Sequence, residues 1–113
     1  MTRVHLPWAV VGVMGAVLSG AMPVGAQAVA DHGQVLDRYC TSCHNDRMRT
    51  ANLSFEALSL DEVGGDAAVW EKVVRKLRSR AMPPAGRPRP DEATNDALAS
   101  FLETTIDQAA AAA

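Results

Sequence analysis

Three stretches of the chain carry apolar residues at the spacing of an amphipathic α-helix. The clearest begins after Asp66, a residue suited to cap a helix N-terminus. Its apolar residues recur at intervals of three and four and so share one face: Trp70, Val73, Val74 and Leu77. A further helix is expected from Pro90 to about Asp107, because proline and the acidic residues that follow it suit a first helical turn. Its apolar stripe consists of Leu98, Phe101, Leu102 and Ile106.

A shorter first helix is expected to start at Asp31, which can act as its N-cap. Its apolar residues are Val35, Leu36 and Tyr39, a stripe too short to be stable alone. Residues 45–65 then form a long connection with short helical turns, anchored by Leu53, Phe55, Leu58 and Leu60. No segment carries a convincing strand pattern. The sequence therefore predicts an all-α fold with about three main helices.

The N-terminal segment has the build of a secretory signal peptide. Arg3 precedes an apolar run from Leu6 to Leu18, and small residues follow that run. Cleavage is expected after Ala26, with sites after Ala28 and Ala30 as competitors. A retained transmembrane anchor is the alternative, but the run is shorter than the roughly 20 apolar residues that span a bilayer. We expect a periplasmic or otherwise exported protein without stable membrane insertion.

A Cys-x-x-Cys-His run, Cys40-Thr41-Ser42-Cys43-His44, ends the first predicted helix. This run is the attachment signature for covalently bound haem c. On a helical turn, residues three and four apart share a face, so both thiols and the imidazole would project together. Cys40 and Cys43 would form thioethers with the haem vinyl groups, and His44 would bind the iron. Thr41 and Ser42 serve as spacers in this interpretation.

Two other kinds of site use paired cysteines. A thiol–disulfide pair would be expected inside a strand–helix–strand unit, which the sequence does not suggest around this motif. A tetrahedral zinc site needs four ligands, whereas the chain has two cysteines. The remaining histidines, His5 and His32, lie in the predicted leader and just after it. Haem attachment is therefore the preferred interpretation.

Met82 is the candidate for the second axial ligand of the haem iron. It lies in the sequence Ala81-Met82-Pro83-Pro84, where the prolines restrict the backbone that aims the sulfur. A thioether opposite histidine favours ferrous iron and raises the reduction potential. Met48 is a rival ligand, but it lies only four residues beyond His44, on the same side of the turn. A packing role for Met82 and an open iron site are the further alternatives.

Charge is distributed unevenly along the chain. The totals are 11 basic and 13 acidic residues, yet residues 72–89 contain seven basic residues and no acidic one. This basic block flanks Met82, so we hypothesise that it compensates the haem propionates or steers an acidic redox partner. Arg80, Arg87 and Arg89 are the main candidates. The basic residues of the second helix are better explained as a solvated face: Lys72, Arg75 and Lys76.

The order of these features over residues 31–107 resembles the small bacterial class I cytochromes c. Three segments are also similar, more narrowly, to the N-terminal haem modules of planctomycete-type multidomain secreted proteins: Tyr39 to Arg47, Trp70 to Leu77 and Met82 to Gly86. The resemblance implies the small class I cytochrome c fold, all-helical around one covalently bound haem. It implies Cys40 and Cys43 as attachment sites and His44 and Met82 as axial ligands.

In that fold the first and last helices cross. The resemblance therefore implies a contact of Val35 or Tyr39 with Phe101 or Leu102.

These expectations divide the chain into a signal peptide (residues 1–26), a cytochrome c domain (27–108) and an Ala-rich tail (109–113). The expected function is that of an exported monohaem electron carrier with redox proteins as partners and no nucleic acid. We find no nucleophile–base pair or carboxylate pair that suggests catalysis, so the chain is not expected to be an enzyme. A haem-based gas sensor with a displaceable sixth ligand and an electron-accepting subunit of an oxidoreductase complex are the alternatives.

Overall fold

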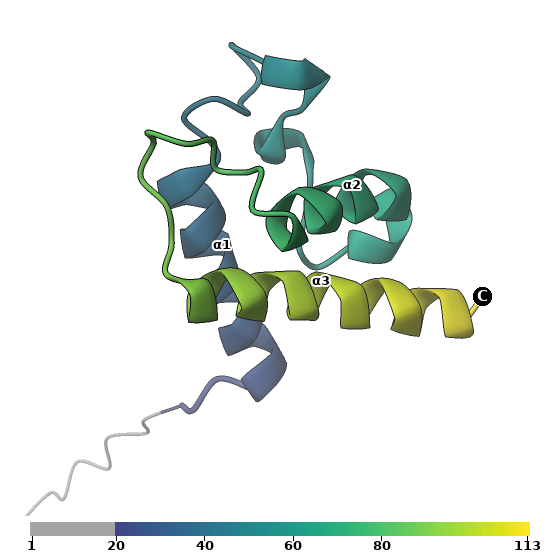
Figure 1. Cartoon of the computed structure of the whole chain (residues 1–113). Coiled ribbons are helices and arrows are strands. Elements are labelled where there is room, and N and C mark those ends of the chain that lie inside the picture. The colour runs from purple at the N-terminus through teal and green to yellow at the C-terminus, as the bar shows by residue number, and fades with distance from the viewer. Residues whose placement is uncertain (1–19) are drawn as a thin grey trace, which may run out of the picture.

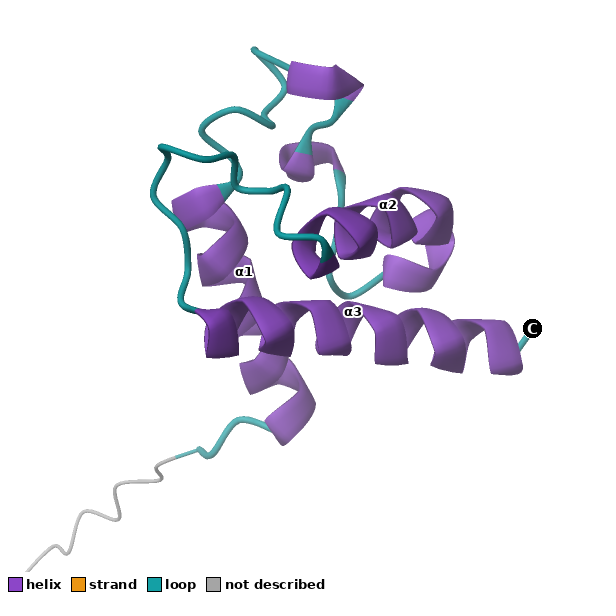
Figure 2. Ribbon diagram, viewed as in Figure 1, coloured by secondary structure: helices purple, strands orange, loops and turns teal. Residues whose placement is uncertain are grey.

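The computed structural model describes residues 20–113, which form helices and loops without any strand in that range (Figures 1 and 2). Its main helices are α1 (Val24–Tyr39), α2 (Ala67–Arg78) and α3 (Glu92–Ala111). Three short 3-10 turns follow one another between α1 and α2: η1 (Thr50–Asn52), η2 (Phe55–Ala57) and η3 (Val63–Asp66). The all-α class with three main helices is confirmed for this range.

The leader expected over residues 1–26 lies mostly outside the described residues. Within residues 20–113, no helix has the length and apolar character that crossing a membrane requires.

α1 begins earlier than the sequence suggested. Its N-cap is Pro23, and Asp31 lies inside the helix, where its carboxylate accepts a hydrogen bond from the Gln27 amide (2.8 Å). The expected start at Asp31 is therefore wrong. Alanine, which is frequent just before Asp31, is the best helix former, so the helix extends toward the N-terminus without a side-chain cap. The cleavage position expected after Ala26 consequently lies in the first turn of α1.

α2 buries the apolar face that its periodicity predicts, with all four stripe residues in the core. Asp66 occupies the expected N-cap position, but its side chain makes no capping hydrogen bond. The backbone at Asp66 already belongs to η3, which runs directly into α2. The position of the cap was predicted correctly and its hydrogen bond was not.

α3 starts where expected and ends later. The Asp91 carboxylate caps it by accepting a hydrogen bond from the backbone N–H of Thr94 (2.7 Å). The helix then continues past Asp107 to Ala111, since alanine favours helix continuation. Much of the segment expected as an Ala-rich tail is therefore helical.

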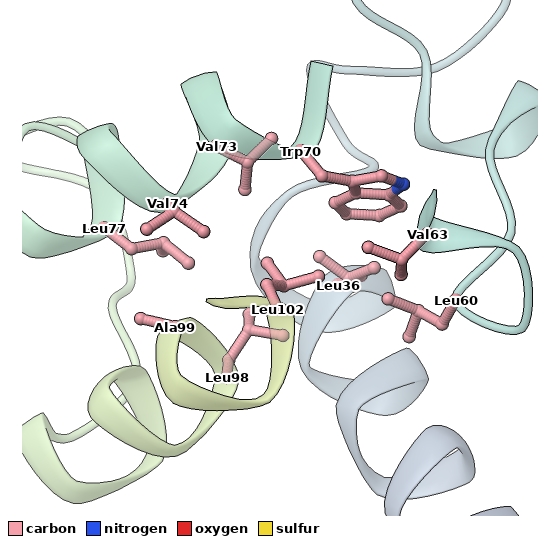
Figure 3. Close-up of a cluster of buried hydrophobic side chains, with 10 residues drawn as sticks. All are labelled: Leu36, Leu60, Val63, Trp70, Val73, Val74, Leu77, Leu98, Ala99 and Leu102. Atoms are coloured by element: carbon pink, nitrogen blue, oxygen red, sulfur yellow. The ribbon is translucent and has the colours of Figure 1, made fainter. Parts of the chain in front are cut away.

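Side chains from α1, α2, α3 and the connection between α1 and α2 meet in one core (Figure 3). Trp70 of α2 is 1% exposed and points toward Leu36 of α1 and Val63 of η3. Leu98 and Leu102 of α3 complete the most deeply buried set. Burial of each such side chain contributes about 1.5–3 kcal/mol to stability. The fold thus holds the connection, α1 and α3 against α2.

α1 crosses α3 (Figure 1), as the resemblance implied. The crossing contains a pair that the sequence did not indicate: the rings of His32 and Phe101 pack at a tilt of 36°, with centroids 4.6 Å apart. Val35 and Phe101 pack at the edge of the core, and Tyr39 is half-buried beneath the Arg38 guanidinium. The expected crossing is present, and His32 supplies a contact across it.

Gly64 marks a close approach between η3 and the end of α3. A Cβ added at Gly64 would lie 2.5 Å from the Cβ of Ala109, whereas one added at Gly65 would meet nothing within 4 Å. We expect Gly64→Ala to lower the free energy of unfolding by about 1–3 kcal/mol through overpacking, and Gly65→Ala to have little effect. Urea denaturation measures both. Ala109→Gly removes the Cβ that is met, so Gly64→Ala should cost little when it is added to Ala109→Gly, and an equal cost in both backgrounds would show that the clash is not the cause.

His32 gives the fold a predicted pH dependence. Burial lowers the pKa of its imidazole, and the neighbouring Asp31 carboxylate opposes that shift only in part. His32 is therefore protonated more readily in the unfolded chain than in the folded chain, and this difference acts once the pH falls below about 6.5. We expect stability to fall between pH 7.5 and pH 5.5, and to fall less in His32→Phe, which keeps an aromatic ring against Phe101. Denaturation midpoints at the two pH values measure this, and equal losses in both proteins would exclude His32 as the source.

Candidate functional site

The Cys-x-x-Cys-His motif forms one tight turn at the end of α1. The backbone N–H of Cys40 still donates to the Leu36 carbonyl of the helix (2.8 Å). The Cys40 carbonyl in turn accepts the N–H groups of Cys43 (3.2 Å) and His44 (3.0 Å). These bonds make a helical turn, which directs residues three and four apart to one face. Cys40, Cys43 and His44 thus lie on one turn, where each side chain is half-buried and both cysteines are unpaired.

His44 is oriented by the connection that follows it. Its Nδ1 lies 2.9 Å from the carbonyl oxygen of Thr50. A carbonyl only accepts hydrogen bonds, so Nδ1 carries the proton and Nε2 keeps a lone pair for a metal. The Phe55 ring packs edge-on against the imidazole, with ring centroids 5.8 Å apart. The imidazole is thus held by a hydrogen bond and by an aromatic contact.

The backbone of the same connection is tied to the motif at two further points. The Thr50 N–H donates to the Cys43 carbonyl (3.2 Å), and the Phe55 N–H donates to the His44 carbonyl (2.9 Å). Residues on both sides of Thr50 adopt left-handed backbone conformations, with φ of 44° at Arg49 and 55° at Ala51. Each residue other than glycine that adopts this conformation costs about 1–2 kcal/mol of stability. Strain of this kind is typical of functional sites, and here it accompanies the placement of the Thr50 carbonyl.

Asn45 is a site residue that the sequence analysis missed. Its side-chain amide donates to the carbonyls of Thr41 (2.7 Å) and Ser42 (3.3 Å). Its side-chain oxygen accepts the N–H groups of Arg47 (3.1 Å) and Met48 (2.8 Å). Thr41 and Ser42 are therefore more than spacers, because their carbonyls bind the amide that fixes the next turn. The tendency of asparagine to bond to nearby backbone is the signal that could have indicated this role.

Met82 lies in the loop of residues 79–91, between α2 and α3, and is half-buried ahead of the buried Pro83. Within residues 20–113, the hydrogen bonds of this loop go to α2, to α3 and to the loop itself. They do not connect it to Cys40–His44, so the approach of Met82 to the motif stays a prediction. The rival Met48 is 59% exposed.

The thiol chemistry of the motif bears on the alternative of a redox dithiol. Burial raises the pKa of the Cys40 thiol to about 11, so at neutral pH it is protonated. Reactive cysteines of thiol–disulfide exchange depend instead on a lowered pKa. Among residues 20–113, no group of three or more His, Cys, Asp or Glu side chains is arranged to hold a metal ion.

Two buried hydrogen-bond donors have no acceptor within the described structure, Trp70 Nε1 and Arg80 Nη1. Buried donors are normally paired, and an unpaired one costs about 1–3 kcal/mol. The Trp70 ring lies 5.8 Å from Phe55, the residue that also contacts His44. Haem carries two propionate carboxylates, which are acceptors of the required kind. Two buried donors without acceptors are the kind of group that a haem with its two carboxylates would satisfy.

Two residues of the basic block are paired with acids of α3 in the structure. Arg78 forms a double hydrogen bond with Glu103 (2.9 and 2.7 Å), which joins α2 to α3. Arg80 is paired with Asp96 (3.0 Å), so much of its charge is compensated inside the fold. Of the three expected candidates, Arg87 and Arg89 form no ion pair within residues 20–113. Arg80 is thus a poor candidate for steering a partner, although its Nη1 is available as a donor.

Comparison of this chain with protein-family models, with curated proteins and with solved structures found no match. The function is therefore argued from the motif and its surroundings.

Proposed function

We propose that this chain is an exported monohaem c-type cytochrome of the class I fold, which carries one electron at a time. Cys40 and Cys43 attach the haem, and His44 and Met82 are its axial ligands. The observation that carries the proposal is the His44 imidazole, whose Nδ1 is committed to the Thr50 carbonyl at 2.9 Å. Nε2 is then the metal-binding nitrogen. Bound haem would supply the redox chemistry, by cycling its iron between ferric and ferrous states.

The surroundings of the motif support this proposal over a reactive dithiol. The two thiols share one turn with His44, the spacing at which one porphyrin edge meets all three. The raised pKa of Cys40 disfavours thiol–disulfide exchange, as described above. Trp70 and Arg80 offer buried donors for the haem carboxylates. These features converge on one cofactor.

The chain's own residues would do the work that an electron carrier requires. Phe55 packs against the His44 ring and restricts its orientation. The hydrogen bond to Thr50 makes the imidazole a better electron donor to a metal and fixes its tautomer. Met82, as a neutral thioether, would hold the reduction potential above that of a bis-histidine site. Two ligands from the protein leave the iron without an open position, so no substrate chemistry is expected.

Arg87 and Arg89 extend the proposal to a partner. Both are exposed and form no ion pair within residues 20–113, so they are suited to attract an acidic redox protein. If they do, electron transfer to that partner slows as salt is added. The gas sensor and the electron-accepting subunit stay as alternatives, because both can use the same attachment motif.

The carrier and the sensor are distinguished by one pair of measurements on protein secreted from a host that matures c-type cytochromes. Voltammetry should give a single reversible one-electron couple, and carbon monoxide should leave the visible spectrum of the reduced protein unchanged. Rapid and tight binding of carbon monoxide would instead favour the sensor. Protein secreted without haem would contradict both functions.

A further inference from the structure

The loop that carries Met82 leaves α2 through a strained residue. After α2 ends, Arg80 adopts a left-handed conformation with φ of 59°. Its N–H donates to the Leu77 carbonyl (3.1 Å), and the Ala81 N–H reaches back to the Lys76 carbonyl (3.0 Å). A residue in the left-handed conformation just after a helix is usually glycine, because any other residue is strained there. This unfavourable backbone conformation directs attention to what the Arg80 side chain contacts.

That side chain anchors the start of the loop to α3. Arg80 Nη2 donates to the Asp96 carboxylate (3.0 Å). Beside it, the buried Asn95 amide donates to the Leu77 carbonyl at the end of α2 (3.3 Å). The N-terminal end of the loop is thus bound to two neighbouring residues of α3, Asn95 and Asp96.

Arg89, near the C-terminal end of the loop, is hydrogen-bonded to Arg80 at its N-terminal end. Its Nη2 donates to the Arg80 carbonyl oxygen (2.8 Å), nine residues earlier in the chain. Arg80 and Arg89 also line a cavity of about 190 Å³ together with Pro90, Glu92 and Asn95. Between the two arginines lie Met82, the buried Pro83 and a turn in which the Arg87 N–H donates to the Pro84 carbonyl (3.2 Å). The Arg89–Arg80 hydrogen bond therefore closes the loop that carries Met82.

We propose that Arg89 is a positioning residue that holds this loop closed and so limits the release of Met82 from the iron. The inference rests on the proposed function, in which Met82 is an axial ligand. The Arg89 hydrogen bond links the two ends of the loop directly, in addition to the bond from Arg80 to Asp96, so a loop movement that separates its ends must break it. The charge of Arg89 is not the cause, and its neighbour Arg87 allows that distinction to be tested.

Arg87 is the matched control. It lies in the same loop, carries the same charge and is exposed, and its side chain forms no hydrogen bond within residues 20–113. Replacing Arg89 or Arg87 by alanine thus removes the same charge from the same loop, but only the first change removes the link between its ends.

The test measures how fast added imidazole replaces Met82 in the oxidised holoprotein, by following the loss of the sulfur-to-iron absorption band. We expect Arg89→Ala to accelerate the replacement about tenfold, as the loss of one hydrogen bond from a charged donor predicts. Arg87→Ala should change the rate by less than about twofold. Equal acceleration in both variants would show that charge alone matters, and no acceleration in Arg89→Ala would show that the hydrogen bond does not govern the loop. Either result overturns the inference.

A third variant separates this inference from the proposed function. Met82→Ala removes the ligand itself and should bind imidazole at the rate of an open iron site. If the unaltered protein binds imidazole as fast as Met82→Ala, Met82 is not an axial ligand, and the proposed ligation fails together with the role of Arg89. If the unaltered protein is much slower and Arg89→Ala matches it, only the role of Arg89 fails.

Discussion

Replacing Cys40 and Cys43 together by alanine is expected to abolish covalent haem attachment. The thioethers are the only links between the protein and the porphyrin itself in the proposed site, because His44 would bind the iron alone. The haem of the double variant should therefore be extracted completely by acidified acetone, whereas that of the unaltered protein should stay with the chain. Absorption of the two fractions measures the distribution.

Ser42→Ala serves as the control for this result. It lies between the two cysteines, is exposed, and its backbone carbonyl can still bind the Asn45 amide. Covalent haem should be retained at the level of the unaltered protein. Haem that resists extraction in the double cysteine variant would contradict the attachment sites proposed here.

Met82→Ala is expected to have the largest effect on the iron itself. The oxidised protein should lose its sulfur-to-iron band, and the reduction potential should fall by on the order of 100 mV, because the axial ligand is the main determinant of that potential. Visible spectroscopy and voltammetry measure the two changes. The reduced variant should also acquire carbon monoxide binding, since a coordination position is opened.

Met48→Ala is the matched control, because Met48 lies closest to the motif in sequence and is 59% exposed. Its spectrum and potential should match those of the unaltered protein. Loss of the band in Met48→Ala with retention in Met82→Ala would reverse the assignment of the sixth ligand.

The helices that could be predicted are those whose signals are local and periodic. The apolar stripe of α2 could be predicted because its residues between Trp70 and Leu77 recur at helical spacing. The Asp91 cap of α3 could be predicted because it is a short-range hydrogen bond, to the backbone of Thr94. The start of α1 was predicted wrongly, because the capping preference of Asp31 competed with the helix propensity of the alanines before it. The end of α3 was placed too early for the same reason.

Contacts between segments far apart in the chain could not be predicted from such signals. The packing of His32 against Phe101 and the double hydrogen bond of Arg78 to Glu103 arise only once the helices are docked. The close approach of Gly64 to Ala109 depends on the same docking. A basic residue inside a basic stretch gives no indication that an acid on another helix compensates it, as Asp96 does for Arg80.

In the candidate site, the sequence indicates the residues proposed to carry the chemistry, while the structure supplies the groups that contact them. Cys40 to His44 are adjacent, so their common face followed from spacing alone. The Thr50 carbonyl could not be foreseen, because it is a backbone group placed by left-handed conformations at Arg49 and Ala51, which residues other than glycine rarely adopt.

The central claim, that this chain holds one covalently bound haem, is tested most directly by the intact mass of the exported protein under denaturing conditions. We predict a single species with the mass of the chain from Gln27 to Ala113 plus one haem. The same measurement reports where the leader is removed, since cleavage after Ala28 or Ala30 would shift the mass by the residues lost. A species with the mass of the polypeptide alone, obtained from a host that attaches haem to a known c-type cytochrome in parallel, would contradict the account.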